Sequence, residues 1–166
     1  MLLVARSIER SLTSLTGKLL DSLESLPPDA LNTWKPAAAR DGSHAMNTFA
    51  ALAAHAFGAA ENWTLIITGA HPATRDRDAE FRAQTTLAAL RAKRDAWLAD
   101  LHTQLAAMTE ADFAAPIPPS LVRSDVTGWT VLDGMMHAID HTALHLGHVQ
   151  IQRQLWEYEK EAATTV

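Results

Sequence analysis

The sequence predicts an all-α protein built as a four-helix bundle. Two observations support this fold class: apolar residues recur at steps of three and four in four long stretches, and no alternating stretch is long enough for a sheet. Connections that contain Pro and Gly separate the stretches, as in helix bundles. The predicted helices cover residues 4–26, 43–68, 82–108 and 130–159. With 166 residues, the chain is expected to form a single domain, 1–166.

The first two helices are predicted from their apolar spacing and their ends. Pro27 and Pro28 stop the first helix, and the segment that follows, through Asp41-Gly42, indicates a loop. Ser43 is a suitable N-cap for the second helix, and Gly69 is suited to the position just after its end. Because this helix is Ala-rich and apolar on most sides, we expect it to be central in the fold.

A polar connection precedes the third helix. Its residues Arg75-Asp76-Arg77-Asp78 favour a solvated loop, and the alternative is an arginine pair that faces the mouth of a site and holds a carboxylate. Glu80 fits the outer face of the third helix. The long connection 109–129 is predicted as a crossing loop, a kind of segment that is often functional. Thr130 is predicted to cap the fourth helix, with Asp133 near the positive end of the helix dipole.

Composition narrows the classes of function. The formal net charge is −5, so no basic surface is predicted, and neither nucleic acid nor membrane is expected as a partner. The absence of cysteine excludes thiolate ligands and a cysteine nucleophile, which leaves His, Asp and Glu as metal ligands. The first residues become charged too soon for a signal peptide, and no run of about 18 apolar residues exists. We therefore expect a cytoplasmic protein.

Four of the eight histidines fall within residues 137–148. On a helix, with about 100° of rotation per residue, His137, His141, His145 and His148 lie within roughly 80° of one another. Two imidazoles four positions apart can meet one ion at about 2.0–2.1 Å each. The spacing therefore indicates a metal site; a buried polar network and a solvated face remain as alternatives.

The second helix supplies a further candidate ligand. His55 is the only titratable residue between His44 and Glu61, and a lone histidine would normally be a core residue, but the cluster on the fourth helix favours a ligand. Bundles bind metals between facing helices, so His55, His141 and His145 are expected to converge at one depth. Three protein ligands leave a position open for water or substrate.

The donor set leaves the metal open. Imidazole suits zinc, nickel, copper or iron. Gly58, three residues after His55, costs about 1 kcal/mol relative to alanine inside a helix and indicates the close approach of another group. No histidine has glutamate three positions earlier, which excludes the Glu-x-x-His pairs of ferritin-like sites. The His-Glu-x-x-His motif is absent too, and nothing supports a serine triad.

Several stretches together resemble the DinB-like superfamily. They are the His141-Thr142-Ala143-Leu144-His145-Leu146-Gly147-His148-Val149-Gln150 segment, the 47–63 stretch with His55, Trp34-Lys35-Pro36, and residues 75–81. The most specific part is a histidine in the second helix combined with His-x-x-x-His and a following glycine in the fourth. The resemblance implies an up-down-down-up bundle.

By the same resemblance, the metal ligands are His55, His141 and His145. Members related to mycothiol-dependent maleylpyruvate isomerase have glutamate where this chain has His141. Many relatives have arginine before the glycine and glutamine after it, whereas this chain has Leu146 and His148. His148 and His137 are therefore taken as supporting or structural residues rather than as ligands.

The resemblance implies a metal-dependent transferase or isomerase that uses a low-molecular-weight thiol such as bacillithiol or mycothiol. The expected cofactor is a divalent ion, zinc or nickel first, and the expected partner is a small-molecule substrate. Arg75, Arg77 and Arg153 are candidate anchors for its carboxylates. The alternatives are a non-catalytic metal-binding or stress-associated bundle and a structural bundle with a vestigial site.

An acid or base beside the ligands would favour the enzyme. Glu61 and Asn62 on the second helix and Asp140 on the fourth are near in sequence, yet Asp140 points about 100° away from His141. None is a convincing second group, although Asn62 remains a candidate for substrate contact. A homodimer formed through helix faces is also expected by resemblance, and the apolar excess of the second helix is compatible with it.

Overall fold

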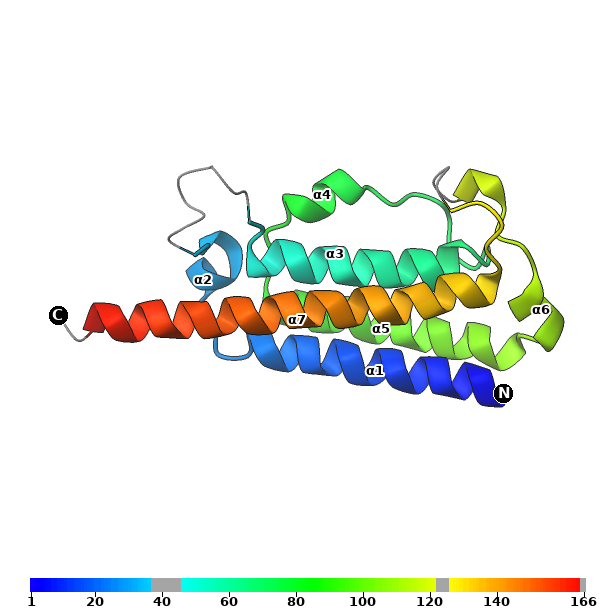
Figure 1. Ribbon diagram of the computed structural model, residues 1–166, viewed down its shortest axis with the longest axis horizontal. Coiled ribbons are helices and arrows are strands. Elements are labelled where there is room, and N and C mark those ends of the chain that lie inside the picture. Colours follow the sequence, from blue (N-terminus) through cyan, green and yellow to red (C-terminus); the bar gives the residue numbers. More distant parts are fainter. Residues whose placement is uncertain (37–45, 122–125, 165–166) are drawn as a thin grey trace.

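The computed structural model describes residues 1–36, 46–121 and 126–164, and these residues form helices with no β-strand among them. The all-α prediction is confirmed. Four long helical segments lie side by side (Figure 1): α1 (Leu3–Leu23), α3 (Phe49–Glu61) with the π-helix η2 (Asn62–Ile66) directly after it, α5 (Leu87–Ala107) and α7 (Val131–Thr164). The shorter elements are α2 (Pro28–Thr33), α4 (Arg77–Phe81), α6 (Glu110–Ala114) and η3 (Pro119–Leu121).

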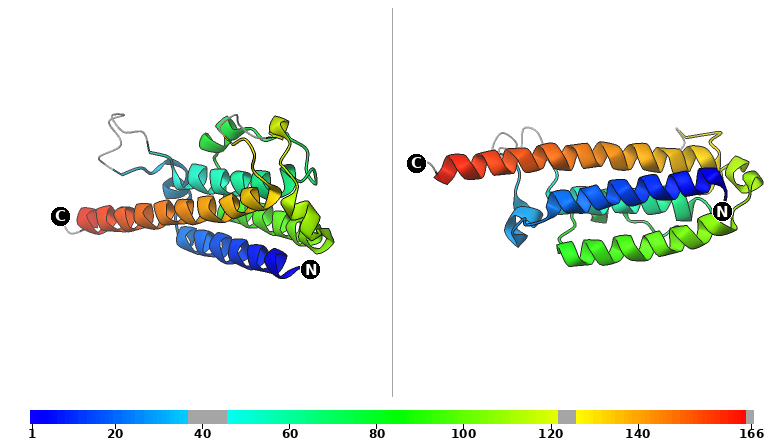
Figure 2. Two further views of the ribbon diagram at one scale, coloured as in Figure 1. Left: turned by 45° about the vertical axis from the view of Figure 1, so that its right-hand side comes forward. Right: turned by 90° about the horizontal axis from the view of Figure 1, so that it is seen from below.

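The four long segments pack around a shared core. Helix α7 contacts α1 and α3, and both of these contact α5. In Figure 1, α1 and α7 run in one direction while α3 and α5 run in the other. The C-terminal part of α7 extends past its neighbours, as both views in Figure 2 also show. In the described ranges, no helix combines the length and the apolar character needed to cross a membrane.

The core consists of two apolar clusters that lie one after the other along the helices. One includes Leu12, Leu65 and Met135, and the other includes Leu19 and Phe57. On α1 and α7, the buried polar residues Thr16 and Thr142 fall between the two clusters in sequence, whereas the buried His55 on α3 falls among residues of the second cluster. We call these three residues the polar layer. The two threonine hydroxyls each donate to the carbonyl four residues earlier, at 2.7 Å, so neither needs another partner.

The first helix is shorter than predicted. It ends at Leu23 rather than at residue 26, because the chain turns at Ser25, which has a φ of 63°. The segment after this helix was predicted as a loop, but part of it is helical. Pro28 begins the short helix α2, a position where its missing N–H costs nothing and its fixed φ suits the helix.

The second helix begins at Phe49 rather than at residue 43. Its cap is Thr48, whose hydroxyl accepts a hydrogen bond from the Ala51 N–H at 3.2 Å. The predicted cap Ser43 and the Asp41-Gly42 turn lie outside the described residues. The helix widens into a π-turn at Asn62, since the Ile67 N–H bonds to the carbonyl five residues back. Gly69 then adopts a φ of 75°, as predicted for the residue after the helix.

The third helix begins at Leu87 rather than at residue 82. The side chain of Thr86 caps it, and the residues before it form α4, which Asp76 caps. Glu80 therefore does not lie on the outer face of the third helix. It belongs to α4, which packs against α3, and its side chain is only 10% exposed.

The fourth helix has the predicted N-cap. Thr130 Oγ1 accepts from the Asp133 N–H, and the Asp133 carboxylate accepts from the Thr130 N–H and hydroxyl. The helix runs to Thr164, beyond the predicted end at residue 159. The crossing loop 109–129 contains two short helical segments, α6 and η3.

We predict that Asp133→Asn destabilises the fold in a pH-dependent way. Hydrogen bonds from the Thr130 hydroxyl and backbone lower the pKa of Asp133 from 3.8. A carboxyl whose folded pKa is lowered stabilises above its ordinary pKa, and this contribution is lost as the pH falls through the folded value. Thermal unfolding followed by circular dichroism should show a lower Tm for the variant at pH 7 and a smaller difference in Tm at about pH 2. An unchanged Tm difference at both pH values would contradict the role of the charge.

Candidate metal centre

Three histidines from two helices come together beside the core. His55 on α3 is buried, His141 and His145 on α7 are half-buried, and one ring nitrogen of each lies within 4.8 Å of the others. The Nε2 atoms of His141 and His145 are 3.3 Å apart. Two nitrogens bound to one tetrahedral ion at about 2.0–2.1 Å lie roughly 3.3–3.4 Å from each other. The spacing of this pair therefore fits a shared metal ion.

His141 and His145 on α7 are neutral at pH 7. Burial and the neighbouring histidines lower the pKa of His141 to about 3 and that of His145 to about 4. Burial also lowers the pKa of His137, against a smaller opposing effect of Asp140. Metal binding to a histidine requires the neutral ring, so protons compete weakly with a metal at His141 and His145.

The other ring nitrogens of His141 and His145 are not used within the described structure. Both Nδ1 atoms are buried and have no hydrogen-bond partner among the described residues. The two rings lie against each other with centroids 4.4 Å apart, and each also contacts the ring of His55. Ring packing, rather than hydrogen bonding at Nδ1, sets the direction of these two side chains.

His55 is held differently, by a carboxylate. Its Nδ1 lies 2.9 Å from Glu80 Oε2, and its ring stacks on Phe81 with centroids 4.4 Å apart. This contact places the proton on Nδ1 and leaves the lone pair of Nε2 for a metal, the arrangement typical of metal-binding histidines. His55 is thus the one ligand candidate with a charged orienting group.

Glu80 is itself held by an arginine. Arg75 Nε donates to Oε1 at 2.7 Å and Arg75 Nη2 donates to Oε2 at 2.8 Å. Burial raises the pKa of Glu80, but the hydrogen bonds from Arg75 and His55 outweigh it and hold the pKa below its usual value. Glu80 is therefore ionised at neutral pH, and His55, Glu80 and Arg75 form a connected chain.

Gly58 makes room for this chain. A Cβ at position 58 would lie 2.0 Å from Glu80 Oε1 and 2.7 Å from its Cδ. The close approach predicted at Gly58 is therefore present, and the approaching group is Glu80. Gly58 carries this signal in the sequence, whereas the sequence pattern placed Glu80 on the outer face of the third helix.

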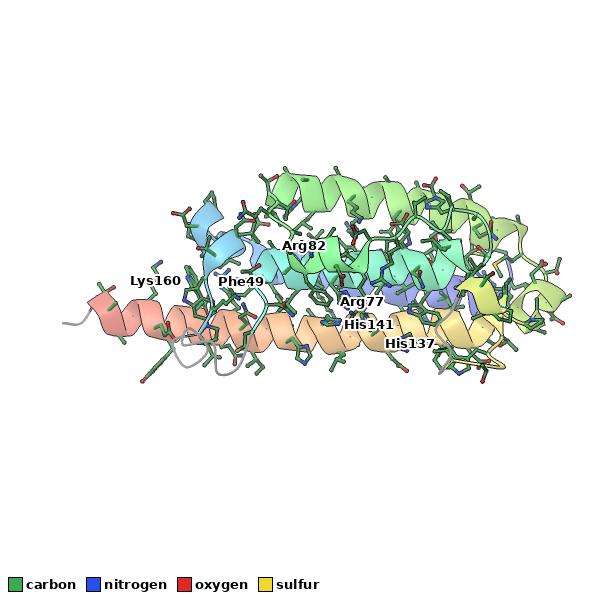
Figure 3. All side chains as sticks on the ribbon, turned by 90° about the horizontal axis from the view of Figure 1, so that it is seen from above. Phe49, Arg77, Arg82, His137, His141 and Lys160 are labelled. Carbon is green, nitrogen blue, oxygen red and sulfur yellow. The ribbon has the colours of Figure 1, made fainter. Side chains whose placement is uncertain are left out.

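A cavity of about 500 Å³ opens beside His55 and His141. It places four predicted residues around one space, in addition to the two histidines: Asn62, Arg75, Arg77 and His137. Figure 3 shows three of the lining residues, Arg77, His137 and His141. The remaining wall includes Ala59, Trp63, Ser120, Leu121, Val126 and Trp129.

Other predicted residues lie elsewhere. His148 is exposed, contacts the ring of His145 at 5.4 Å and does not line this cavity. Arg153 hydrogen-bonds to Glu157 and to the Glu24 carbonyl, so it is not an anchor here. Arg75, which was favoured as part of a solvated loop, is largely buried at 18% exposure because it pairs with Glu80. Of the two interpretations of this segment, an arginine pair that faces a site fits better than a solvated loop, because Arg75 and Arg77 both line the cavity.

We predict that Gly58→Ala weakens metal binding while preserving the helix. The new methyl group would displace Glu80 from His55, and loss of such an orienting partner typically lowers metal affinity by about 10–100-fold. Isothermal titration with zinc would measure this change, with circular dichroism to check helicity. Gly147→Ala is the matched control. Gly147 is on α7, the helix that carries His141 and His145, but a Cβ added at position 147 has no neighbouring atom within 4 Å. Equal affinities in the two variants would refute the role of the Glu80 contact.

Comparisons with known proteins identify the family. The sequence matches the family model of the DinB superfamily over residues 11–149, which includes α1 from Ser11 onward, the whole α3–α5 region and the ligand-bearing part of α7. No curated protein matches the sequence. The matched range contains His55, His141 and His145 and covers most of the chain, so this protein belongs to the DinB superfamily.

Proposed function

We propose that this protein is a metal-dependent S-transferase or isomerase that uses a low-molecular-weight thiol, on an up-down-down-up four-helix bundle. The observation that supports the proposal best is the cluster of three histidines, two of which, His55 and His141, line an open cavity. A structural metal site would be closed by a fourth protein ligand, whereas three ligands leave a position for a reacting molecule. Zinc or nickel is the proposed ion, since both accept imidazole nitrogen.

A divalent ion at this site would supply Lewis acidity that lowers the pKa of a bound thiol far enough to deprotonate it at neutral pH. His55, His141 and His145 would hold it, with His55 kept in the Nδ1–H form by Glu80. Arg75 keeps Glu80 ionised and in place, so the orientation of His55 does not depend on solvent. The tryptophan side chains of the cavity exclude water from one side of the reacting groups.

In the proposed transfer, the thiol sulfur forms a bond to an electrophilic carbon, and the leaving group departs with the electron pair of the bond that breaks. The thiol proton passes to solvent, because none of the described residues that line the cavity is a carboxylate. A small-molecule substrate follows from the volume of the cavity. The homodimer, the cytoplasmic location and the absence of nucleic-acid and membrane partners stay predictions.

We predict that metal binding depends on the three histidines. Plasma mass spectrometry of untagged protein should find about one metal per chain in the wild type, and loss of most of it in His55→Ala and His145→Ala. His102→Ala is the control. The His102 side chain is exposed and pairs with Glu9, and neither residue belongs to the candidate metal site. Circular dichroism would establish that each variant is folded. Wild-type protein without metal after resupply would overturn the proposed site.

We predict thiol transfer to a chromogenic electrophile. With 1-chloro-2,4-dinitrobenzene, thioether formation and chloride release should be accelerated by the metal-loaded protein with bacillithiol or mycothiol as thiol, and His145→Ala should lose at least about 90% of this rate. A metal-loaded wild type that accelerates no thiol reaction over a panel of electrophiles would instead favour a non-catalytic metal-binding protein.

A further inference from the structure

The cavity has an aromatic wall. Trp63 and Trp129 contact each other with ring centroids 5.5 Å apart, and His137 meets both rings edge-on at 4.9 and 5.4 Å. The three side chains come from η2, from the segment before α7 and from α7, and all are only partly buried. The rings pack on one another, with the two tryptophan planes tilted by 43°, and they present apolar surface to the cavity. Such a surface favours a flat apolar group over a flexible polar one.

The cavity also carries one positive charge that the described residues leave without an acidic partner. Arg75 is neutralised by Glu80, whereas Arg77 makes no hydrogen bond or ion pair within the described ranges. The Arg77 guanidinium lies over the Phe81 ring at 4.8 Å, and Phe81 in turn stacks on His55. This stack holds Arg77 beside the ligand candidates while its N–H groups stay available.

We propose that the cavity selects molecules with a carboxylate on a flat conjugated or aromatic group. Arg77 binds the carboxylate and the Trp63–Trp129 wall packs against the flat group. Arginine matches this ligand because its planar N–H groups meet a carboxylate in two parallel hydrogen bonds. The inference deepens the proposed function, on which it rests: the carboxylate belongs either to the electrophile or to the thiol.

The test measures binding rather than turnover. Calorimetric titrations compare the binding of 2-naphthoate with that of the neutral 2-naphthamide. The full-length protein is first stripped of metal, so that the carboxylate cannot bind a metal ion directly. Wild type should bind naphthoate about tenfold more tightly than the amide. Arg77→Gln should remove this preference, and Trp129→Leu should weaken both ligands. Arg82→Gln is the matched control, because Arg82 is an exposed arginine at the end of α4 that does not line the cavity (Figure 3).

A second arm distinguishes the two sources of carboxylate. Mercaptosuccinate represents a thiol that carries carboxylates, and naphthoate represents an acid without a thiol. Arg77-dependent binding of naphthoate assigns the carboxylate to the electrophile. Arg77-dependent binding of mercaptosuccinate alone assigns it to the thiol and overturns the preference for a flat group, because mercaptosuccinate has none. If neither ligand binds in an Arg77-dependent way, the proposal is wrong. A protein that binds naphthoate through Arg77 but transfers no thiol would refute the proposed function and leave this binding site standing.

Discussion

The contact between His55 and Glu80 constrains the rest of the site. A carboxylate that leaves water costs several kcal/mol unless it is paired, so Glu80 can lie against α3 only with Arg75 and His55 beside it. Gly58 permits the approach, since any side chain there would occupy the place of Glu80. The contact fixes α4 over α3, and through α4 it also fixes Arg77 at the cavity.

The position of the site along the bundle follows from how the core is divided. Apolar residues of α3 and α7 fill two clusters. His141 and His145 come between the clusters in sequence, and His55 comes among the α3 residues of the second cluster. The clusters secure the helices on both sides of the polar layer by burial of apolar surface, which is the main favourable term in folding. The fold does not depend on the imidazole rings for its hydrophobic stabilisation. Their positions can therefore suit metal binding.

Much of this arrangement could be predicted from the sequence, and the missing parts have a common physical origin. The histidines were found because i, i+4 spacing on one helix is a local property, and Thr130 was found because capping is local too. Glu80 was missed because its role depends on a contact with a residue 25 positions away. In the sequence, only Gly58 indicated this contact. A glycine indicates that another group approaches the helix, but it does not identify that group. The start at Leu87 and the π-turn at Asn62 likewise depend on packing between helices.

The unequal support of the three histidines links metal binding to stability. His55 donates its Nδ1 proton to a charged acceptor, whereas the Nδ1 atoms of His141 and His145 are buried without partners in the described structure. A buried polar atom without a partner costs about 1–3 kcal/mol. Since both rings are neutral at pH 7, their Nε2 atoms 3.3 Å apart share at most one proton between them. An ion that accepts both Nε2 lone pairs removes the conflict at Nε2, and each Nδ1 then carries a proton that no described residue accepts. A ligand that binds only the folded chain stabilises it by RT ln(1 + [L]/Kd). The same geometry that suits a metal therefore makes the metal-free site the least satisfied part of the described core.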